Sequence, residues 1–269
     1  HEVRATQRPQ GQGGSDRGAT CVLAVTPDRL EMVDLRPGYG ERSWGLMAQM
    51  YSVRSKASWG IGDFADLSDL ADLAGDRGAD FLLINPIHAA EVVGRIEPSP
   101  YLPATRRFVS PLYIRPEDVR EAAYLPSNQR ALVEWALDSV SVSNDDPDVL
   151  DRDAAWTAKK SALEVLFRAP RSAGRERAYA AFVAREGRAL ADFALWCAIE
   201  EHYEGTLRPE AADDATSDLV AQLRRDLADR VDFYSWMQWV ADEQLAAAQA
   251  AGKAAGMKLG MVHGLAVGV

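Results

Sequence analysis

The chain has 269 residues, of which 47% are hydrophobic and 26% charged, an ordinary globular composition that excludes disorder over the whole length. Its 30 basic and 40 acidic side chains give a net charge of −10, which repels phosphate backbones and anionic lipid, so we expect no nucleic-acid and no membrane partner. The sequence has no apolar run of about 18 residues and no signal-peptide pattern, and it therefore predicts a cytoplasmic protein.

The beginning of the chain is its least structured part. Residues 1–19 are polar and glycine-rich, with too little apolar surface to hold a fixed structure, so we expect a loop or a disordered arm. Residues 21–25 form a short apolar run closed by Pro27 and Asp28, which predicts one strand without a visible partner. Cys21 and Cys197 have no metal-ligand neighbours, so neither a disulfide framework nor a zinc module is predicted, and both are expected to be buried thiols.

From Trp44 onward the sequence alternates between strand and helix patterns. Residues 45–51 predict a short strand, and residues 81–86 form the continuous apolar run of a parallel strand buried on both faces. Between them Asp63 can cap a helix that Gly78 ends. The apolar residues of this helix recur at helical spacing: Phe64, Leu67, Leu70 and Leu73 or Ala74.

The same pattern returns near the end, with a helix over residues 233–255 and a strand over residues 258–262. The intervening sequence is mainly helical. One helix is predicted by Trp156, Lys160, Leu163 and Phe167, and a longer one by the apolar residues between Tyr179 and Ile199. We therefore predict an α/β fold, a barrel or a doubly wound sheet, with a helical subdomain inserted between its second and third strands.

In such a fold, ligand-binding groups gather at the carboxyl edge of the sheet, because the loops there vary while the core holds the strands. Three segments reach this edge: the loop after Tyr51, residues 85–113 and residues 263–265. The second of these contains four prolines between Pro86 and Pro103, so it is stiff.

The stiff segment carries His88, Ser99, Tyr101 and Arg106. A stiff segment presents its hydroxyl groups and its aromatic plane with little loss of conformational entropy on binding. This arrangement suits a sugar, which has an apolar ring face and a polar rim. The alternative is that Tyr101 and Phe108 pack the insert onto the sheet while the arginines form surface ion pairs.

A series of ordered motifs narrows this interpretation. They lie at residues 44–45, 49–55 (Gln-Met-Tyr-Ser-Val-Arg-Ser), 58–64 (Ser-Trp-Gly-Ile-Gly-Asp-Phe), 84–88 (Ile-Asn-Pro-Ile-His), 99–103 (Ser-Pro-Tyr-Leu-Pro), 111–114, 236–239, 242–245 and 265–269. In this order they resemble the amylomaltases, the 4-alpha-glucanotransferases of glycoside hydrolase family 77, in their actinobacterial form. The resemblance covers most of residues 42–269 and is weaker inside the insert.

The resemblance implies the N-terminal part of a (β/α)8 (TIM) barrel over residues 41–269, with a large all-helical insert at about residues 115–230 after the second strand. Residues 1–40 would then be a flexible arm and the tail of a β-rich N-terminal domain. It also implies a retaining mechanism with a covalent glycosyl-enzyme, acting on maltooligosaccharides and other α-1,4-glucans with no metal and no cofactor. The sequence makes no prediction of oligomeric state.

In the family, the nucleophilic Asp, the acid/base Glu and the transition-state Asp belong to strands beyond the third. We therefore predict no catalytic residue in this chain and no turnover by the chain alone. Because a three-stranded barrel cannot close, we expect such a fragment to be unstable or to associate. Family members also commonly have an acidic residue just before Leu265, where this chain has Gly264 after His263.

Among the residues present, the resemblance makes Tyr101 the first choice for stacking on the donor sugar, with Ser99 as a hydroxyl partner. Asn85 and His88 at the end of the second strand, and His263 at the end of the third, are further candidates for sugar contacts. The alternatives are that Asn85 only ties down the loop and that His88 is a satisfied core histidine.

Other conspicuous residues point to structure. Asp63 precedes an apolar helix and is predicted to be its N-cap. The adjacent pairs Asp242–Glu243 and Glu200–Glu201 lie on helices, where neighbours point about 100° apart, so they cannot flank one bond and are expected on solvated faces. Trp196, Trp236 and Trp239 have helical spacing and are expected in the core.

Two rival functions remain. The first is a non-catalytic glucan-binding or interaction module that keeps the same loop. The second is a related α-glucan hydrolase that uses water as the acceptor.

Overall fold

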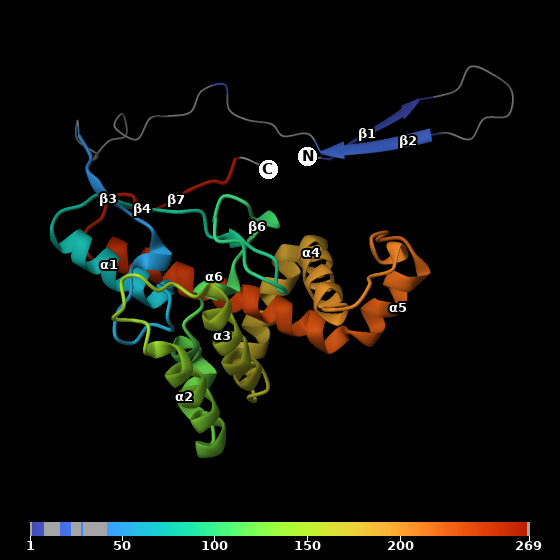
Figure 1. Ribbon diagram of the computed structural model, residues 1–269. Coiled ribbons are helices and arrows are strands. Elements are labelled where there is room, and N and C mark those ends of the chain that lie inside the picture. Colours follow the sequence, from blue (N-terminus) through green and yellow to red (C-terminus); the bar gives the residue numbers. More distant parts are fainter. Residues whose placement is uncertain (1, 8–16, 23–27, 29–41, 268–269) are drawn as a thin grey trace, which may run out of the picture. The chain divides into compact units, whose positions relative to one another are not determined.

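The computed structural model describes residues 2–7, 17–22, 28 and 42–267 of the chain (Figure 1). The chain divides into two compact units, residues 1–43 and residues 44–269. The predicted strand at residues 21–25 and the motif at residues 265–269 each lie partly outside the described residues.

The first unit contains an antiparallel pair of strands, β1 (Glu2–Gln7) and β2 (Arg17–Val22). This differs from the expected loop or disordered arm, and it also gives Cys21 a partner strand. The register aligns Val3 with Cys21 and Ala5 with Ala19, so the sparse apolar positions of the two segments coincide. Cross-strand pairing thus supplies an order that the composition of one segment alone did not reveal.

The second unit contains a three-stranded parallel sheet in the order β3 (Gly45–Ala48), β4 (Phe81–Ile84) and β7 (Gly260–His263). Helices separate the strands along the sequence, which confirms the predicted α/β class. The strands are shorter than predicted. The first of them, β3, ends early because the chain turns into the 3-10 helix η2 (Met50–Ser52). On β4 only alternate residues are fully buried, which differs from the expected burial of both faces.

Helix α1 (Phe64–Asp76) begins as the sequence predicts. The Asp63 carboxylate accepts from the backbone of Ala65 and Asp66, and the Asp66 carboxylate accepts from the backbone of Asp63, which completes a capping box. The helix buries Phe64, Leu67 and Ala74, whereas Leu73 is exposed. Gly78 follows it with a φ of 84°, the left-handed conformation that glycine adopts most readily.

The segment between β4 and β7 contains a short antiparallel pair and then helices. The pair is β5 (His88–Ala89) with β6 (Thr105–Val109). After it come the 3-10 helices η3 (Pro111–Tyr113), η4 (Pro116–Asp118) and η5 (Arg120–Tyr124), the helices α2 (Ser127–Ser141), α3 (Arg152–Phe167) and α4 (Ala173–His202), and then η6 (Glu210–Ala212), α5 (Asp218–Asp226) and α6 (Ala228–Ala254). Helix α4 contains a kink at Gly187, whose φ is 62°, so the long predicted helix is not continuous.

Helix α6 connects the sheet with the helical segment. It packs along α1 and against α4, and Figure 1 shows it running past the three strands. Trp236 and Trp239 are buried in the core and Trp196 is partly buried, as their helical spacing predicts. The Phe167 ring of α3 packs against Trp236 with the ring centroids 5.6 Å apart.

A buried ionic cluster joins α1 to the helical segment. The Asp63 carboxylate accepts from Arg115 Nε at 2.7 Å and from Lys159 Nζ at 3.2 Å, and Lys159 also donates to Leu112 O at 2.9 Å. Arg115 Nη2 lies 3.1 Å from Asp66 Oδ2. Burial alone would raise the pKa of Asp63, but Lys159 and Arg115 outweigh it and hold that pKa below its usual value.

Within the described residues, no helix is both long enough and apolar enough to cross a membrane.

Candidate functional site

The carboxyl ends of β3, β4 and β7 meet at one edge of the sheet. The parallel register places Ala48 beside Ile84 and Ile84 beside His263. The three segments that the sequence predicts at this edge therefore do follow neighbouring strands, and ligand sites of parallel α/β folds form at such an edge.

Asn85 directly follows β4 at this edge and is buried. Its side-chain Oδ1 accepts from the backbone N–H of Met50 at 2.7 Å, which ties the end of β3 to the end of β4. Its Nδ2 donates to Pro86 O at 2.7 Å and to Tyr113 Oη at 3.5 Å. All of these bonds are internal, as expected for a residue that fixes the loop.

His88 and Arg106 together hold the loop that follows β7. The backbone N–H of Ala266 donates to His88 Nε2 at 3.3 Å, and Arg106 Nη1 donates to the carbonyl oxygen of the same residue at 3.3 Å. We call these two contacts the Ala266 clamp. Because Nε2 acts as an acceptor, the clamp requires a neutral His88 imidazole. Ala266 itself is buried, whereas its neighbours Leu265 and Val267 are exposed.

The electrostatics of this edge favour the neutral form of both histidines. Partial burial, and then the positive charge of Arg106, lower the pKa of His88 below its usual 6.5. Burial, and then His88, lower the pKa of His263 in the same direction. The structure thus brings these two predicted residues close enough to interact electrostatically.

We expect the pKa of His88 to lie below 6.5 in a histidine NMR titration, and to rise when Arg106→Met removes the neighbouring charge. A His with a lowered folded pKa contributes stability that is complete above the unfolded pKa near 6.5 and falls as the pH drops through the folded value. The Ala266 clamp is therefore present at pH 7 and lost in acid. A His88→Asn variant assigns the resonance, and a His88 pKa that Arg106→Met leaves unchanged would contradict the assigned role of Arg106.

Ser99 and Tyr101 lie together in a tight turn between β5 and β6. Leu102 N donates to Ser99 O at 3.3 Å, and Tyr101 N donates to Ser99 Oγ at 3.3 Å. Proline at the second position of this turn restricts its backbone. Tyr101 remains 49% exposed.

The two aromatic residues of the stiff segment have different environments. Phe108 is buried and stacks on Phe193 of α4 with the ring centroids 4.4 Å apart, so it does pack the helical segment. Tyr101 has no ring contact with any residue that the structure describes. Tyr101 thus shares no ring packing of the kind that joins Phe108 to α4.

Gly264 follows β7 where the backbone leaves little space. Its N–H donates to Ile84 O at 2.8 Å. A Cβ atom at this position would lie 2.9 Å from Ile84 O and 2.9 Å from Pro86 Cδ. An acidic residue here would therefore require the loop to shift, which gives a steric reason for glycine in this chain.

The carboxylates that the sequence marked as structural are engaged elsewhere. Asp63 caps α1 and pairs with buried cations. Each member of the two adjacent pairs forms an ion pair: Asp242 with Arg185, Glu243 with Arg175, Glu200 with Arg208, and Glu201 with Arg230 and Lys160. Glu200 and Glu201 are less exposed than expected, because these cations cover them. Among the described residues, no group of three or more His, Cys, Asp or Glu side chains is arranged to hold a metal ion.

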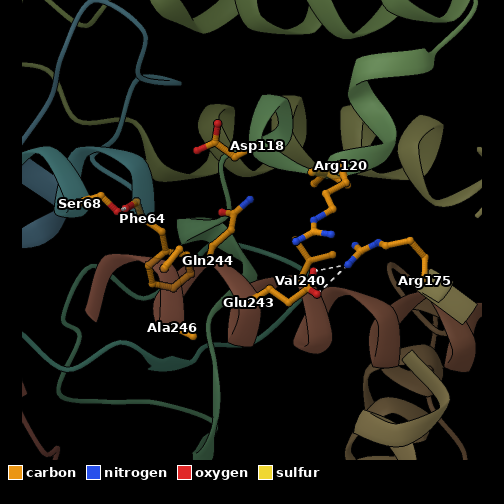
Figure 2. A pocket seen from close by; sticks show the side chains of 11 residues that line it. Phe64, Ser68, Asp118, Arg120, Arg175, Val240, Glu243, Gln244 and Ala246 are labelled. Carbon is orange, nitrogen blue, oxygen red and sulfur yellow. Dashed lines mark hydrogen bonds and ion pairs between the residues drawn. The ribbon is translucent and has the colours of Figure 1, made fainter. Parts of the chain in front are cut away.

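A separate cavity of about 610 Å³ lies between α1, α6 and the segment of η4 and η5 (Figure 2). Its polar side chains largely bind other protein groups. Arg175 Nη1 lies 2.6 Å from Glu243 Oε1, and Gln244 bonds to both the N–H and the carbonyl oxygen of Arg115 at 2.8 Å. None of the residues that we predict to contact a sugar lines this cavity.

Some contacts at the edge have no counterpart among the sequence predictions. They are the Ala266 clamp and the guanidinium of Arg152, which lies 4.8 Å from the centroid of the Tyr51 ring. The pairing of β5 with β6 brings Arg106 near His88. In the sequence this pairing is hard to recognise, because β5 has only two residues. No local pattern connects Tyr51 with Arg152.

Comparison with known proteins gives consistent matches over most of the chain. Residues 48–269 match the family model described as 4-alpha-glucanotransferase. The 4-alpha-glucanotransferases of Mycobacterium tuberculosis and Mycobacterium bovis are 49% identical over 263 residues, covering 94% of this chain and 36% of each relative. One from Haemophilus influenzae is 30% identical over 226 residues, covering 78% of this chain and 32% of that protein.

Solved structures match as well. The amylomaltase of Corynebacterium glutamicum superposes with a TM-score of 0.80 at 43% identity, over 94% of this chain and 34% of that one. The amylomaltase of Streptococcus agalactiae, solved in complex with acarbose, superposes with a TM-score of 0.66 at 17% identity, over 82% of this chain and 43% of that one, which supports the fold alone. The chain spans about a third of the length of the curated relatives it matches.

Proposed function

This chain belongs to the 4-alpha-glucanotransferase family of glycoside hydrolase family 77, and on that premise we propose that the whole protein transfers segments of α-1,4-glucan between maltooligosaccharides. The observation that carries the proposal is the family match over residues 48–269. The structure supports it, because a proline-containing turn in the segment that follows β4 leaves the Tyr101 ring 49% exposed. Cytoplasmic location remains a prediction.

We propose that the strands β3, β4 and β7 are the first three of a (β/α)8 barrel, with the helical segment inserted after the second. Their parallel order and their separation by helices support this arrangement. The catalytic carboxylates would then come from later strands. In support, the carboxylates of the two helical pairs and Asp63 are all engaged in ion pairs.

The reaction would proceed in two displacements with retention. In the first, a carboxylate oxygen bonds to C1 of the donor sugar as the bond from C1 to the leaving 4-oxygen breaks, and the acid/base carboxyl gives its proton to that oxygen. In the second, the 4-hydroxyl of an acceptor glucan attacks C1, the enzyme ester breaks, and the proton returns to the acid/base. The residues of this chain would bind and orient the sugars.

Within this scheme we propose roles for the edge residues. Tyr101 would stack on the donor sugar nearest the cleaved bond, and Ser99 would offer it a hydroxyl oxygen. His263 would face the same sugars. Asn85 and His88 would act mainly through the loops they fix, because their hydrogen bonds go to backbone atoms of the edge and to Tyr113.

Incubation of the full-length protein with maltotriose tests the proposed activity. Transfer produces a ladder of shorter and longer maltooligosaccharides together with glucose, with the number of reducing ends unchanged. Reducing ends that rise without longer products would instead identify a hydrolase, and no product at all would favour the non-catalytic glucan-binding module. Turnover by residues 1–269 alone would show that the catalytic carboxylates lie in this chain.

A further inference from the structure

Helices α2 and α3 lie side by side in the helical segment (Figure 1) and form a groove of about 600 Å³ between them. Leu132, Trp135 and Ser139 line one wall, and Thr157, Ser161 and Val165 line the other. The spacing of three to four residues on each helix places each set on one face. The volume lies within the range of about 300–1,000 Å³ that is typical of sites for small molecules.

Trp135 is the dominant feature of this groove. Its side chain is 76% exposed, and neighbouring Leu132 is 54% exposed. No hydrogen bond, ion pair or ring contact joins the Trp135 indole to the rest of the described chain. A large indole left in water loses the stabilisation that burial would give it, and contiguous exposed apolar side chains such as Trp135 and Leu132 are typical of binding surfaces.

The polar groups of the groove accept hydrogen bonds but have little left to donate. Ser139 Oγ donates to Ala136 O at 2.7 Å, Thr157 Oγ1 to Asp153 O at 2.8 Å, and Ser161 Oγ to Thr157 O at 3.0 Å. Each hydroxyl proton is therefore used within its own helix, while each oxygen keeps the capacity to accept a hydrogen bond. A complementary ligand must bring its own hydroxyl donors.

The lining side chains are also all uncharged, although 26% of the whole sequence is charged. A ligand that matches this surface is neutral, has apolar faces for the indole and Leu132, and carries several hydroxyl donors along its edge. A purely apolar helix from a second copy of the chain would leave the three hydroxyl oxygens without donors, which is unfavourable.

We propose that the α2–α3 groove is a surface site for an α-1,4-glucan segment, distinct from the sheet edge, with Trp135 stacking on a sugar ring. None of the edge residues Asn85, His88, Ser99, Tyr101 and His263 lines it. The choice of glucan as the ligand rests on the proposed function. The site would hold a long substrate on the enzyme while its end enters the reaction.

The test compares full-length variants by native electrophoresis in gels containing soluble amylose, run in the cold, and by initial rates on maltotriose. Trp135→Ala is expected to weaken the apparent affinity for amylose about tenfold, which corresponds to about 1.4 kcal/mol. Its rate on maltotriose should stay within about twofold of wild type. The matched control is Leu207→Ala, because Leu207 is 94% exposed and lies outside the groove.

A second pair of variants separates a sugar from an apolar partner. Thr157→Val and Ser161→Ala remove acceptor oxygens with little change of shape and should each weaken amylose binding severalfold. Stronger binding by these variants would overturn the proposal. Because the lining is uncharged, raising sodium chloride from about 50 to about 500 mM should not weaken binding.

Other outcomes are equally decisive. If amylose retards Trp135→Ala as much as wild type, the groove is not a glucan site. If Trp135→Ala also converts a dimer to a monomer, the groove is an interface between copies and the proposal fails. If Trp135→Ala weakens amylose binding in a protein that does not disproportionate maltotriose, the proposed function fails while the surface site stands.

Discussion

Replacing Asp63 with asparagine is expected to lower the free energy of unfolding of the full-length protein by about 3–5 kcal/mol, the usual cost of leaving a buried charge without its partner. The new amide side chain would still cap α1, because asparagine is among the best N-cap residues. The loss therefore reports on the ion pairs and hydrogen bonds to Arg115 and Lys159, and not on the cap. Lys159 is fully buried, and without Asp63 its ammonium group would have no carboxylate of the described residues within hydrogen-bond distance.

Urea unfolding measures this loss, and two further variants make it specific. Asp72→Asn changes an exposed carboxylate on the same helix and should stay within about 0.5 kcal/mol of wild type. Adding Lys159→Met to Asp63→Asn should recover part of the loss, because the unpaired ammonium is removed. If Asp63→Asn lowered the free energy of unfolding by less than about 1 kcal/mol, the cluster would contribute no more than a surface ion pair, which would contradict this prediction.

The same cluster has a pH signature. Since the folded pKa of Asp63 lies below its ordinary value of 3.8, its contribution to stability is complete above pH 3.8 and is lost as the pH falls through the folded pKa. The wild-type protein should therefore lose stability in acid more steeply than Asp63→Asn. If the free energy of unfolding of the two proteins fell equally steeply with decreasing pH in acid, this assignment would be wrong.

Replacing Tyr101 with alanine is expected to lower kcat/KM for maltotriose in the full-length protein by about tenfold to a hundredfold, corresponding to about 1.4–2.8 kcal/mol of lost transition-state binding. The ring is half exposed and packs on no described aromatic residue, so the free energy of unfolding should hardly change. A lowered kcat/KM with unchanged stability would therefore assign the effect to sugar binding and not to folding.

Two variants of the same turn control this result. Tyr101→Phe keeps the ring and should retain most of the activity. Leu102→Ala changes a neighbouring side chain that is about equally exposed, and its kcat/KM should stay close to that of wild type. A Tyr101→Ala enzyme with wild-type kcat/KM would contradict the proposed stacking of Tyr101 on the donor sugar.

The sequence predicted well those elements whose signals are local. Asp63, the apolar positions from Phe64 to Ala74 and Gly78 lie within one short stretch, and together they fix the start, the buried face and the end of α1. The apolar runs at β4 and near β7 likewise predicted a parallel α/β unit in the correct order. The pattern failed for β1 and β2, because neither strand is apolar enough by itself and only their pairing reveals them.

The second role of Asp63 shows what local patterns leave out. Its partners Arg115 and Lys159 lie 52 and 96 residues further along the chain, and the sequence near Asp63 contains no sign of them. The Ala266 clamp spans 178 residues in the same way. Such contacts depend on how helices and loops pack, and no period of three to four residues encodes them.

The sequence by itself determined the alternation of strands and helices, the cap of α1, the family and the stiffness of the Tyr101 turn, since each depends on residues close together or on motifs in fixed order. The tertiary structure alone decided the surroundings of the candidate site residues. It exposed Tyr101, turned Asn85 and His88 toward the backbone, left Gly264 no space for a side chain and opened a groove beside Trp135. Those outcomes depend on packing between distant segments, where burial and hydrogen-bond partners are set only after the chain has folded.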